Sequence, residues 1–257
     1  MVMTLYPLHT KILVPGDDLT SIIIKEIENQ RVPPLKDGDI IVITSKAVAS
    51  TEGRIVKLSD VKPSEEAHRL AKETELEPEF VELVIRESEK NYGGVYRAIL
   101  TIKNNILQAN AGIDKSNVPS GYAVLLPENP ARSAHIIRNQ IYKKTGLKIG
   151  VIIADSRTQP LRLGTTGFAL GVAGFKPVID ERGKKDLYGN ILRITRRAVA
   201  DNLACAAEIL MGEGSEQIPV VIIKGAPVEM TENYVDENQM IIPREECIYF
   251  GTIFKKK

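Results

Sequence analysis

A mixed α/β or α+β fold is predicted by two observations: Val- and Ile-rich segments of strand length recur along the chain, and helical patterns lie between them. Gly, Pro, Asn or Asp bounds the apolar segments, as is typical where strands end in turns. The strands and helices alternate irregularly, so their order alone does not separate the two fold classes. In chain order, strands are expected at 12–14, 40–44, 96–102, 123–126, 149–154 and 220–223.

The helices are predicted from residues that favour helix starts. Asp17 and Asp18 precede a helical pattern that extends to about Glu28. Ser64 is followed by two glutamates, which is an N-terminal helix signal, and Pro78 stands at a first-turn position before 79–89. Two further helical patterns cover 133–145 and 198–211.

The chain is expected to form a single unit over residues 1–257, because it contains no internal repeat and no low-complexity linker. Pro127 and Pro130 interrupt the pattern and mark a candidate boundary between two subdomains near 128–132. With 43% hydrophobic residues, the 257-residue chain can bury one large core or two smaller ones.

The charge balance and the cysteines restrict the partners and the compartment. Lys and Arg total 34 against 33 for Asp and Glu, so we expect neither nucleic acid nor an anionic membrane as a partner. Cys205 and Cys247 lie far apart, which favours a reducing, cytoplasmic setting. No apolar stretch approaches the roughly 18 residues of a membrane span, and no signal peptide is expected.

Several common catalytic signatures are missing. The sequence has no Walker A pattern, and the glycines of 211–215 do not complete a GxGxxG motif. His9, His68 and His135 lack the spacing of zinc ligands, so no metal role is expected for them. No GxSxG motif supports a serine hydrolase. If a nucleotide binds, another arrangement must hold it.

Three segments instead place acidic or small polar side chains in turns beside apolar runs: 110–117, 151–156 and 210–214. Asp155 follows a buried strand and is poorly hydrated unless a cation or several donors meet it. Each carboxylate taken alone is better explained as the cap of a helix or turn. Together, carboxylates and one hydroxyl without Cys or His suit Mg²⁺ or Mn²⁺, the ions of phosphoryl transfer.

A basic stretch follows the second of these segments. Its guanidinium and ammonium groups could hold a polyanionic substrate, although interleaved acidic residues show that a solvated face explains at least half of them. The basic residues are Arg157, Arg162, Arg182, Lys184, Lys185, Arg193, Arg196 and Arg197.

These segments resemble the coenzyme F-420-0 gamma-glutamyl ligase family, with matching strings in the family's order from about residue 5 to residue 225. The resemblance implies an α+β fold with mixed sheets and flanking helices, and an intertwined homodimer with its active site in a groove. The matching strings are Glu52-Gly53-Arg54, Ala111 to Asn117, Leu125 to Pro130, Ser133-Ala134, Asp155-Ser156 with Pro160 and Arg162, Ala169 to Gly174, Asp186 to Gly189, Ala200-Asp201 and Met211 to Glu213.

The resemblance also implies a reaction. GTP would phosphorylate the terminal carboxylate of a deazaflavin precursor, and the amine of L-glutamate would attack the acyl phosphate, so that GDP and phosphate are released. A carboxylate is a poor electrophile, whereas an acyl phosphate has a good leaving group, and divalent cations stabilise the developing charge. Two Mg²⁺ or Mn²⁺ ions and K⁺ are expected, and no covalent enzyme nucleophile is required.

Site residues are carried over by position. Asp114 and Asp155 would hold one divalent ion, and Ser156 and Glu213 a second. Asn117 would contact the nucleotide. The other residues expected at the nucleotide are Leu8, His9, Thr10, Lys11, Ser45, Lys46, Met211, Gly212, Gly214 and Ser215, in a loop that continues to Ile218.

Two departures from the family pattern affect the substrates. Ser50 stands where the family commonly has a lysine expected at the phosphates, and Lys46 is the candidate replacement. Thr158 and Gln159 stand where the family commonly has Gly-Arg, so Arg157 and Arg162 are the candidates for binding the acid substrate.

Two alternatives therefore stay open. One is a paralogous nucleotide-dependent amide ligase with another acid or amino acid, which changes around 157–161 would favour. The other is a non-catalytic nucleotide- or deazaflavin-binding protein. The presence of all the metal carboxylates argues against this second alternative.

Overall fold

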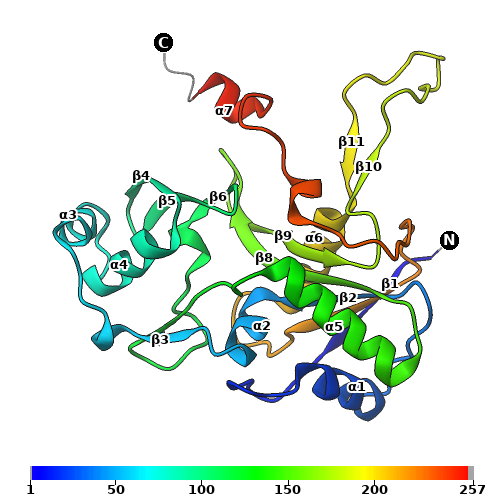
Figure 1. Cartoon of the computed structure of the whole chain (residues 1–257), viewed down its shortest axis with the longest axis horizontal. Coiled ribbons are helices and arrows are strands. Elements are labelled where there is room, and N and C mark those ends of the chain that lie inside the picture. Colours follow the sequence, from blue (N-terminus) through cyan, green and yellow to red (C-terminus); the bar gives the residue numbers. More distant parts are fainter. Residues whose placement is uncertain (1, 254–257) are drawn as a thin grey trace.

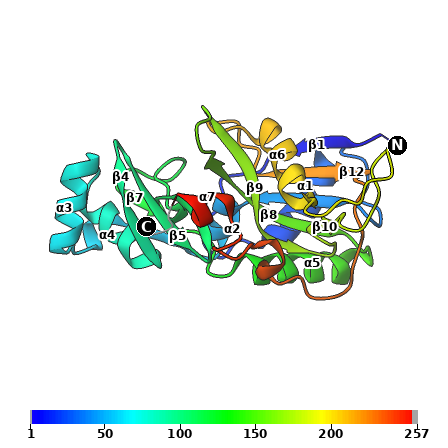
Figure 2. The same cartoon turned by 90° about the horizontal axis from the view of Figure 1, so that it is seen from above.

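The computed structural model describes residues 2–253 and is built around a mixed five-stranded sheet (Figures 1 and 2). Its central strands contain long apolar segments that are buried on both faces, as strands covered by helices on each side must be. β2 and β8 pair in parallel, and Thr44 lies opposite Ala154 in their register. The strand order is β1 (Thr4–Leu8), β12 (Val220–Lys224), β2 (Ile40–Thr44), β8 (Gly150–Thr158) and β9 (Thr165–Ala173).

Helices cover both faces of this sheet, as Figure 1 shows. Alternation along β2 sends Ile41 and Ile43 into one core and Ile40 and Val42 into the other. The first core contains residues of α1 (Leu19–Asn29), α2 (Ser45–Thr51) and α5 (Pro130–Thr145), and the second contains residues of α6 (Val199–Met211). The predicted α+β class, with mixed sheets and flanking helices, is confirmed.

Residues 55–124, here called the small lobe, have a hydrophobic core of their own and lie at one end of the molecule (Figure 2). A three-stranded and a two-stranded sheet pack there with two helices. The predicted boundary near 128–132 lies after the chain has returned to the main sheet, and it stays a prediction. The lobe contains β3 (Ile55–Lys57), η1 (Leu58–Asp60), α3 (Glu65–Thr74), α4 (Pro78–Glu87), β4 (Lys90–Val95), β5 (Ala98–Lys103), β6 (Ile106–Ala109), η2 (Asn110–Gly112) and β7 (Tyr122–Val124).

Arg54 joins the small lobe to the returning chain. Its Nε donates to the carbonyl oxygen of Leu126 at 3.1 Å, and its Nη2 lies 3.0 Å from Glu87 Oε2. We expect Arg54→Met to lower the free energy of unfolding by about 2 kcal/mol, because the Leu126 carbonyl loses its side-chain donor and the half-buried Glu87 carboxylate keeps only Lys103. Urea denaturation of Arg69→Met is the matched control, since the exposed Arg69–Glu73 pair is worth at most about 0.5 kcal/mol. Equal losses in the two variants would contradict this role of Arg54.

The remaining segments extend from the main sheet. The hairpin of β10 (Val178–Asp180) and β11 (Arg196–Ala198) projects away from it (Figure 1). The chain after β12 contains η3 (Glu237–Met240) and α7 (Ile248–Thr252). Arg138 of α5 anchors this segment through Glu232, with 2.8 Å between the charged groups. None of the helices between residues 2 and 253 is both long enough and apolar enough to cross a membrane.

Most predicted elements are confirmed with small shifts at their ends. The side chains of Asp18 and Ser64 cap α1 and α3, as their sequence signals indicate. The strand predicted at 12–14 is wrong: this stretch is irregular, because β12 is already fully paired with Thr4–Leu8 on that side. The strand predicted at 96–102 begins at Ala98, since Arg97 takes a positive φ of 59° in the preceding turn.

Candidate active site

A cleft of about 670 Å³ lies where the main sheet meets the small lobe. The parallel pairing of β2 and β8 ends at this cleft, and the carboxyl ends of parallel strands are the usual place for a ligand in such sheets. Ser45 follows directly after β2, and Asp155 is the residue of β8 next after Ala154. The topology therefore brings two polar positions, far apart in sequence, to one point.

Asp155 lies in the floor of the cleft, where only part of its surface reaches solvent. Desolvation raises the pKa of this carboxyl to about 7, against the opposing effects of the Ser156 backbone N–H, the Lys46 charge and the Ser45 hydroxyl. The Ser156 N–H donates to Asp155 Oδ1 at 2.9 Å. Asp155 is thus a carboxyl that has lost water without gaining full compensation, as its sequence position predicts.

Asp114 approaches the same cleft from the small lobe. A backbone bridge to Val124 fixes its main chain, with N···O distances of 3.1 and 2.9 Å. Its carboxylate accepts from Lys46 Nζ at 2.7 Å, from Ser116 Oγ at 2.5 Å and from the Ser116 N–H at 2.9 Å. Although burial acts to raise its pKa, these donors together hold the pKa below the usual range.

The loop after α6 supplies the third carboxylate. Glu213 Oε1 accepts from the Thr165 hydroxyl at 2.9 Å, which ties the loop to β9. Glu208, one turn before the end of α6, also lines the cleft and has a buried Oε1 without a hydrogen-bond partner. Burial, together with contact to Glu213, raises the Glu208 pKa. Two negative charges side by side are unfavourable, so Glu208 is a further candidate cation ligand.

Asn117 connects the two sides of the cleft. Its Nδ2 donates to the carbonyl oxygen of Gly214 at 2.9 Å, so the small lobe and the loop after α6 are tied together. Asn117 takes a positive φ of 55°, a conformation that Asn tolerates better than most residues. The geometry of this turn accordingly gives one reason for Asn at this position.

Most of the predicted site residues line the cleft, but not all of them do. Leu8 is fully buried in β1, and His9 is exposed, with its N–H bonded to Gln30 Oε1. Arg157 packs its guanidinium 4.7 Å from the Phe168 ring centroid, outside the cleft lining, and Arg162 lies on the exposed β8–β9 turn. The predicted residues that line the cleft are Thr10, Lys11, Ser45, Lys46, Asp114, Asn117, Asp155, Ser156, Met211, Gly212, Glu213, Gly214 and Ser215.

Sequence reasoning missed two parts of the cleft. Glu208 carries no motif, although a glutamate beside Ala207 on the Ala-rich face of a helix is an available signal. The apolar part of the wall is the second omission, because it comes from loops. It includes Ile12, Leu13, Val118 and Pro119.

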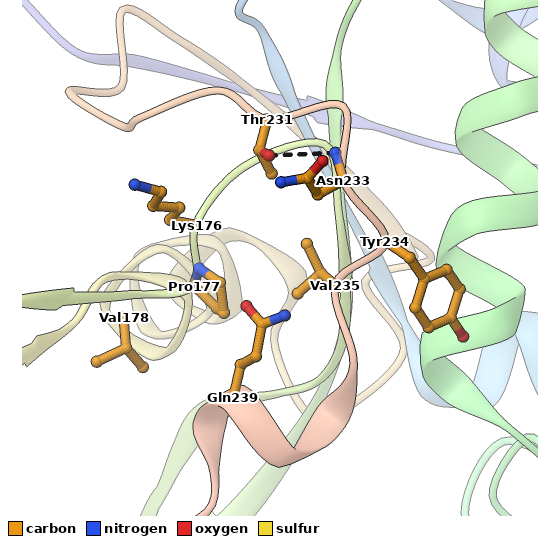
Figure 3. Close-up of a pocket in the computed structure, with 8 residues that line it drawn as sticks. All are labelled: Lys176, Pro177, Val178, Thr231, Asn233, Tyr234, Val235 and Gln239. Atoms are coloured by element: carbon orange, nitrogen blue, oxygen red, sulfur yellow. Dashed lines mark hydrogen bonds between the residues drawn. The ribbon is translucent and has the colours of Figure 1, made fainter.

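A second pocket, of about 150 Å³, lies where the chain after β12 crosses the β9–β10 connection (Figure 3). Lys176, Pro177, Tyr234 and Gln239 are among its walls, and the Asn233 N–H donates to Thr231 Oγ1 at 3.2 Å across one side. It contains none of the predicted site residues. We therefore take the larger cleft as the candidate active site.

The residues of the larger cleft fit a divalent cation of the Mg²⁺ or Mn²⁺ type. The donors are carboxylate and hydroxyl oxygens, Asp155 has lost hydration, and Glu208 Oε1 has no partner. Within residues 2–253, no three His, Cys, Asp or Glu side chains already converge as a metal centre. Lys46 supplies the positive charge nearest Asp114 instead. The ion assignments of Asp114, Asp155, Ser156 and Glu213 stay predictions.

Comparison with known proteins shows that this chain is an enzyme of the acid–amino-acid ligase class. The family model described as F420-0:Gamma-glutamyl ligase matches residues 7–225. The chain belongs to this family, and the predicted resemblance is confirmed.

Curated relatives share about two-fifths of their residues with this chain over most of their length. A coenzyme F420:L-glutamate ligase of Methanothermobacter thermautotrophicus is 40% identical over 237 residues, covering 92% of this chain and 94% of the relative. The protein of the same name from Methanocaldococcus jannaschii is 41% identical, covering 84% and 86%. That from Archaeoglobus fulgidus is 38% identical, covering 89% and 91%.

Proposed function

We propose that this enzyme adds L-glutamate through a gamma-linkage to coenzyme F-420-0, with GTP as co-substrate and an acyl phosphate as intermediate, releasing GDP and phosphate. The observation that carries the proposal is the cleft itself, which is lined by the carboxylates of Asp114, Asp155 and Glu213 together with Lys46 and Asn117. We further propose that it works in the cytoplasm, as a homodimer, with two Mg²⁺ or Mn²⁺ ions and K⁺.

The proposed chemistry explains why acidic residues line a site for an acidic substrate. A carboxylate attacks the terminal phosphate only if the charges of both groups are compensated, and divalent ions, when bound, supply that compensation. Asp114, Asp155, Ser156 and Glu213 would hold the ions. The chain's own part is to fix these oxygens on two separate cores, so that little reorganisation is needed when the reactants bind.

Nucleotide binding is supported by the composition of the cleft wall. Ile12, Leu13 and Val118 provide an apolar surface of the kind that a base packs against. Lys46 and Lys11 offer ammonium groups for phosphates. Lys11 is paired with Asp17 at 2.6 Å.

The second candidate function differs from the first in the identity of the acid substrate. Arg157 also lies 3.9 Å from Asp201, so its charge is partly satisfied away from the cleft. Leu161 and Leu163, in the β8–β9 turn, are fully exposed. These observations favour, as the alternative, an amide ligase of the same mechanism with another acid.

The homodimer proposal is supported by the β10–β11 hairpin. Its turn exposes Leu187, Tyr188 and Ile194 almost completely, which is costly for a hairpin surrounded by water. A second copy of this chain would cover such a projecting apolar arm.

Mass spectrometry of a reaction with F-420-0, L-glutamate, GTP, Mn²⁺ and K⁺ tests the proposal. We expect the mass of F-420-0 to increase by one or more glutamyl units, with GDP formed in equal amount, and no product when GTP is omitted or replaced by GDP. An unchanged mass, from folded protein that binds GTP, would contradict F-420-0 as the substrate and favour the other acid. A glutamylated product formed from GTP without release of GDP would contradict the acyl-phosphate intermediate.

A further inference from the structure

Lys46 occupies a central position in the candidate active site. It lies in the first turn of α2, and its ammonium group bridges Asp114 Oδ2 and Ser116 Oγ, at 2.7 Å each. Its side chain is 28% exposed and that of Asp114 is 48% exposed, so both are accessible from the cleft. A partly exposed ion pair contributes little free energy, so Lys46 and Asp114 can separate and bind other partners.

If the Asp114 carboxylate bound Lys46 and a divalent cation at the same time, the two positive charges would repel each other. Both are positively charged, and a divalent ion bound to Asp114 would lie within about 4 Å of the ammonium group, where like charges repel by roughly 2 kcal/mol even at the dielectric constant of water. A lysine on a four-carbon stem can move away from its partner, whereas Asp114 is held by its backbone bridge to Val124. Lys46 is therefore the group that moves.

We propose that Lys46 is an internal counter-ion: it neutralises Asp114 until a divalent cation binds there, and is then released into the cleft to bind the anionic phosphates of the nucleotide. The inference rests on the proposed function, because it takes Asp114 as a cation ligand. It also assigns to Lys46 two successive partners, so that cation and nucleotide each favour binding of the other. Such coupling is reciprocal.

The first test measures Mn²⁺ binding to metal-free protein without nucleotide, by electron paramagnetic resonance of free Mn²⁺ at pH 8. We expect Lys46→Met to bind Mn²⁺ about tenfold more tightly than wild type, because the competing charge is gone. The control is Lys115→Met. Lys115 pairs with Glu77 at 3.0 Å and has a similar exposure of 30%, but lies outside the cleft lining. Its removal should leave the Mn²⁺ affinity unchanged.

The second test measures GDP binding in the presence of EDTA. Asp114→Asn should tighten GDP binding several-fold, because it releases Lys46 toward the phosphates. In the double variant Asp114→Asn with Lys46→Met this gain should disappear. If Asp114→Asn acted only by removing a negative charge from the cleft, GDP binding would tighten equally with and without the Lys46→Met substitution.

The outcomes separate this inference from the proposed function. Equal Mn²⁺ affinities of wild type and Lys46→Met, or a weaker affinity of the variant, would overturn the counter-ion role and leave the cation site in place. Absence of Mn²⁺ binding from both folded proteins would overturn the cation site as well. Tighter binding by Lys46→Met together with a Lys46-dependent gain in Asp114→Asn supports the inference.

Discussion

Asp155→Asn should reduce the rate of glutamate addition at least about a thousandfold at saturating Mn²⁺. The substitution keeps the shape of the side chain at the cleft floor but removes the charge that a cation requires. The measurement is the rate of product formation by mass spectrometry, with Mn²⁺ binding determined in parallel. Activity within tenfold of wild type would contradict the assignment of Asp155 to the cation site.

The stability of Asp155→Asn provides the control for folding, because the substitution should raise stability while it lowers activity. The pKa of Asp155 in the folded protein, about 7, lies above the ordinary value of 3.8. Between these values the folded protein holds a proton that the unfolded chain has lost, so stability falls as the pH rises and is lowest above pH 7. The asparagine variant avoids this loss.

Without metal, we therefore expect Asp155→Asn to melt about 2–4 °C above wild type at pH 8, with the difference vanishing near pH 4. With saturating Mn²⁺ the order should reverse, since only wild type gains the binding energy. Asp60→Asn, at an exposed residue, should change neither melting curve. A metal-free variant that melts below wild type at pH 8 would contradict the desolvation of Asp155.

The secondary structure could be predicted from the sequence where the local residue pattern favours the same element that the packing of the whole fold requires. β2 and the first half of β8 are apolar runs, and α1 and α3 carry their own capping residues, so each can be predicted to within a few positions. The stretch 12–14 is apolar for a different reason, since Ile12 and Leu13 line the cleft. Periodicity cannot distinguish an apolar wall from a strand in three residues.

The candidate site could be predicted in composition but not in arrangement. Asp155 is conspicuous as an acid at the end of a buried strand, and the structure places it next to Ser45 because β2 and β8 are parallel neighbours. The position of Arg157 could not be foreseen: Phe168, across the β8–β9 pair, attracts the guanidinium away from the cleft. Such cross-strand contacts depend on register, which the sequence does not state.

Gly167 should prove one of the most sensitive positions for stability, because α6 lies directly on it. A Cβ at this residue would stand 2.6 Å from the carbonyl oxygen of Ala204 and 2.9 Å from the backbone N of Cys205. These atoms belong to a helix and cannot move singly. Cys205 Sγ also donates to the Gly167 carbonyl oxygen at 2.9 Å, which shows how closely helix and strand approach.

We expect Gly167→Ala to lower the free energy of unfolding by about 3 kcal/mol, in the range of overpacked cores, as measured by urea denaturation. Gly214→Ala is the matched control, because its Cβ would meet only the flexible end of Glu216, at 3.4 Å or more, and should cost under about 1 kcal/mol. Since α6 ends in the loop that carries Glu213, the displaced helix should also weaken Mn²⁺ binding. A Gly167→Ala variant as stable as wild type would mean that α6 can slide along β9, and the loop after it would then not be held in place by the sheet.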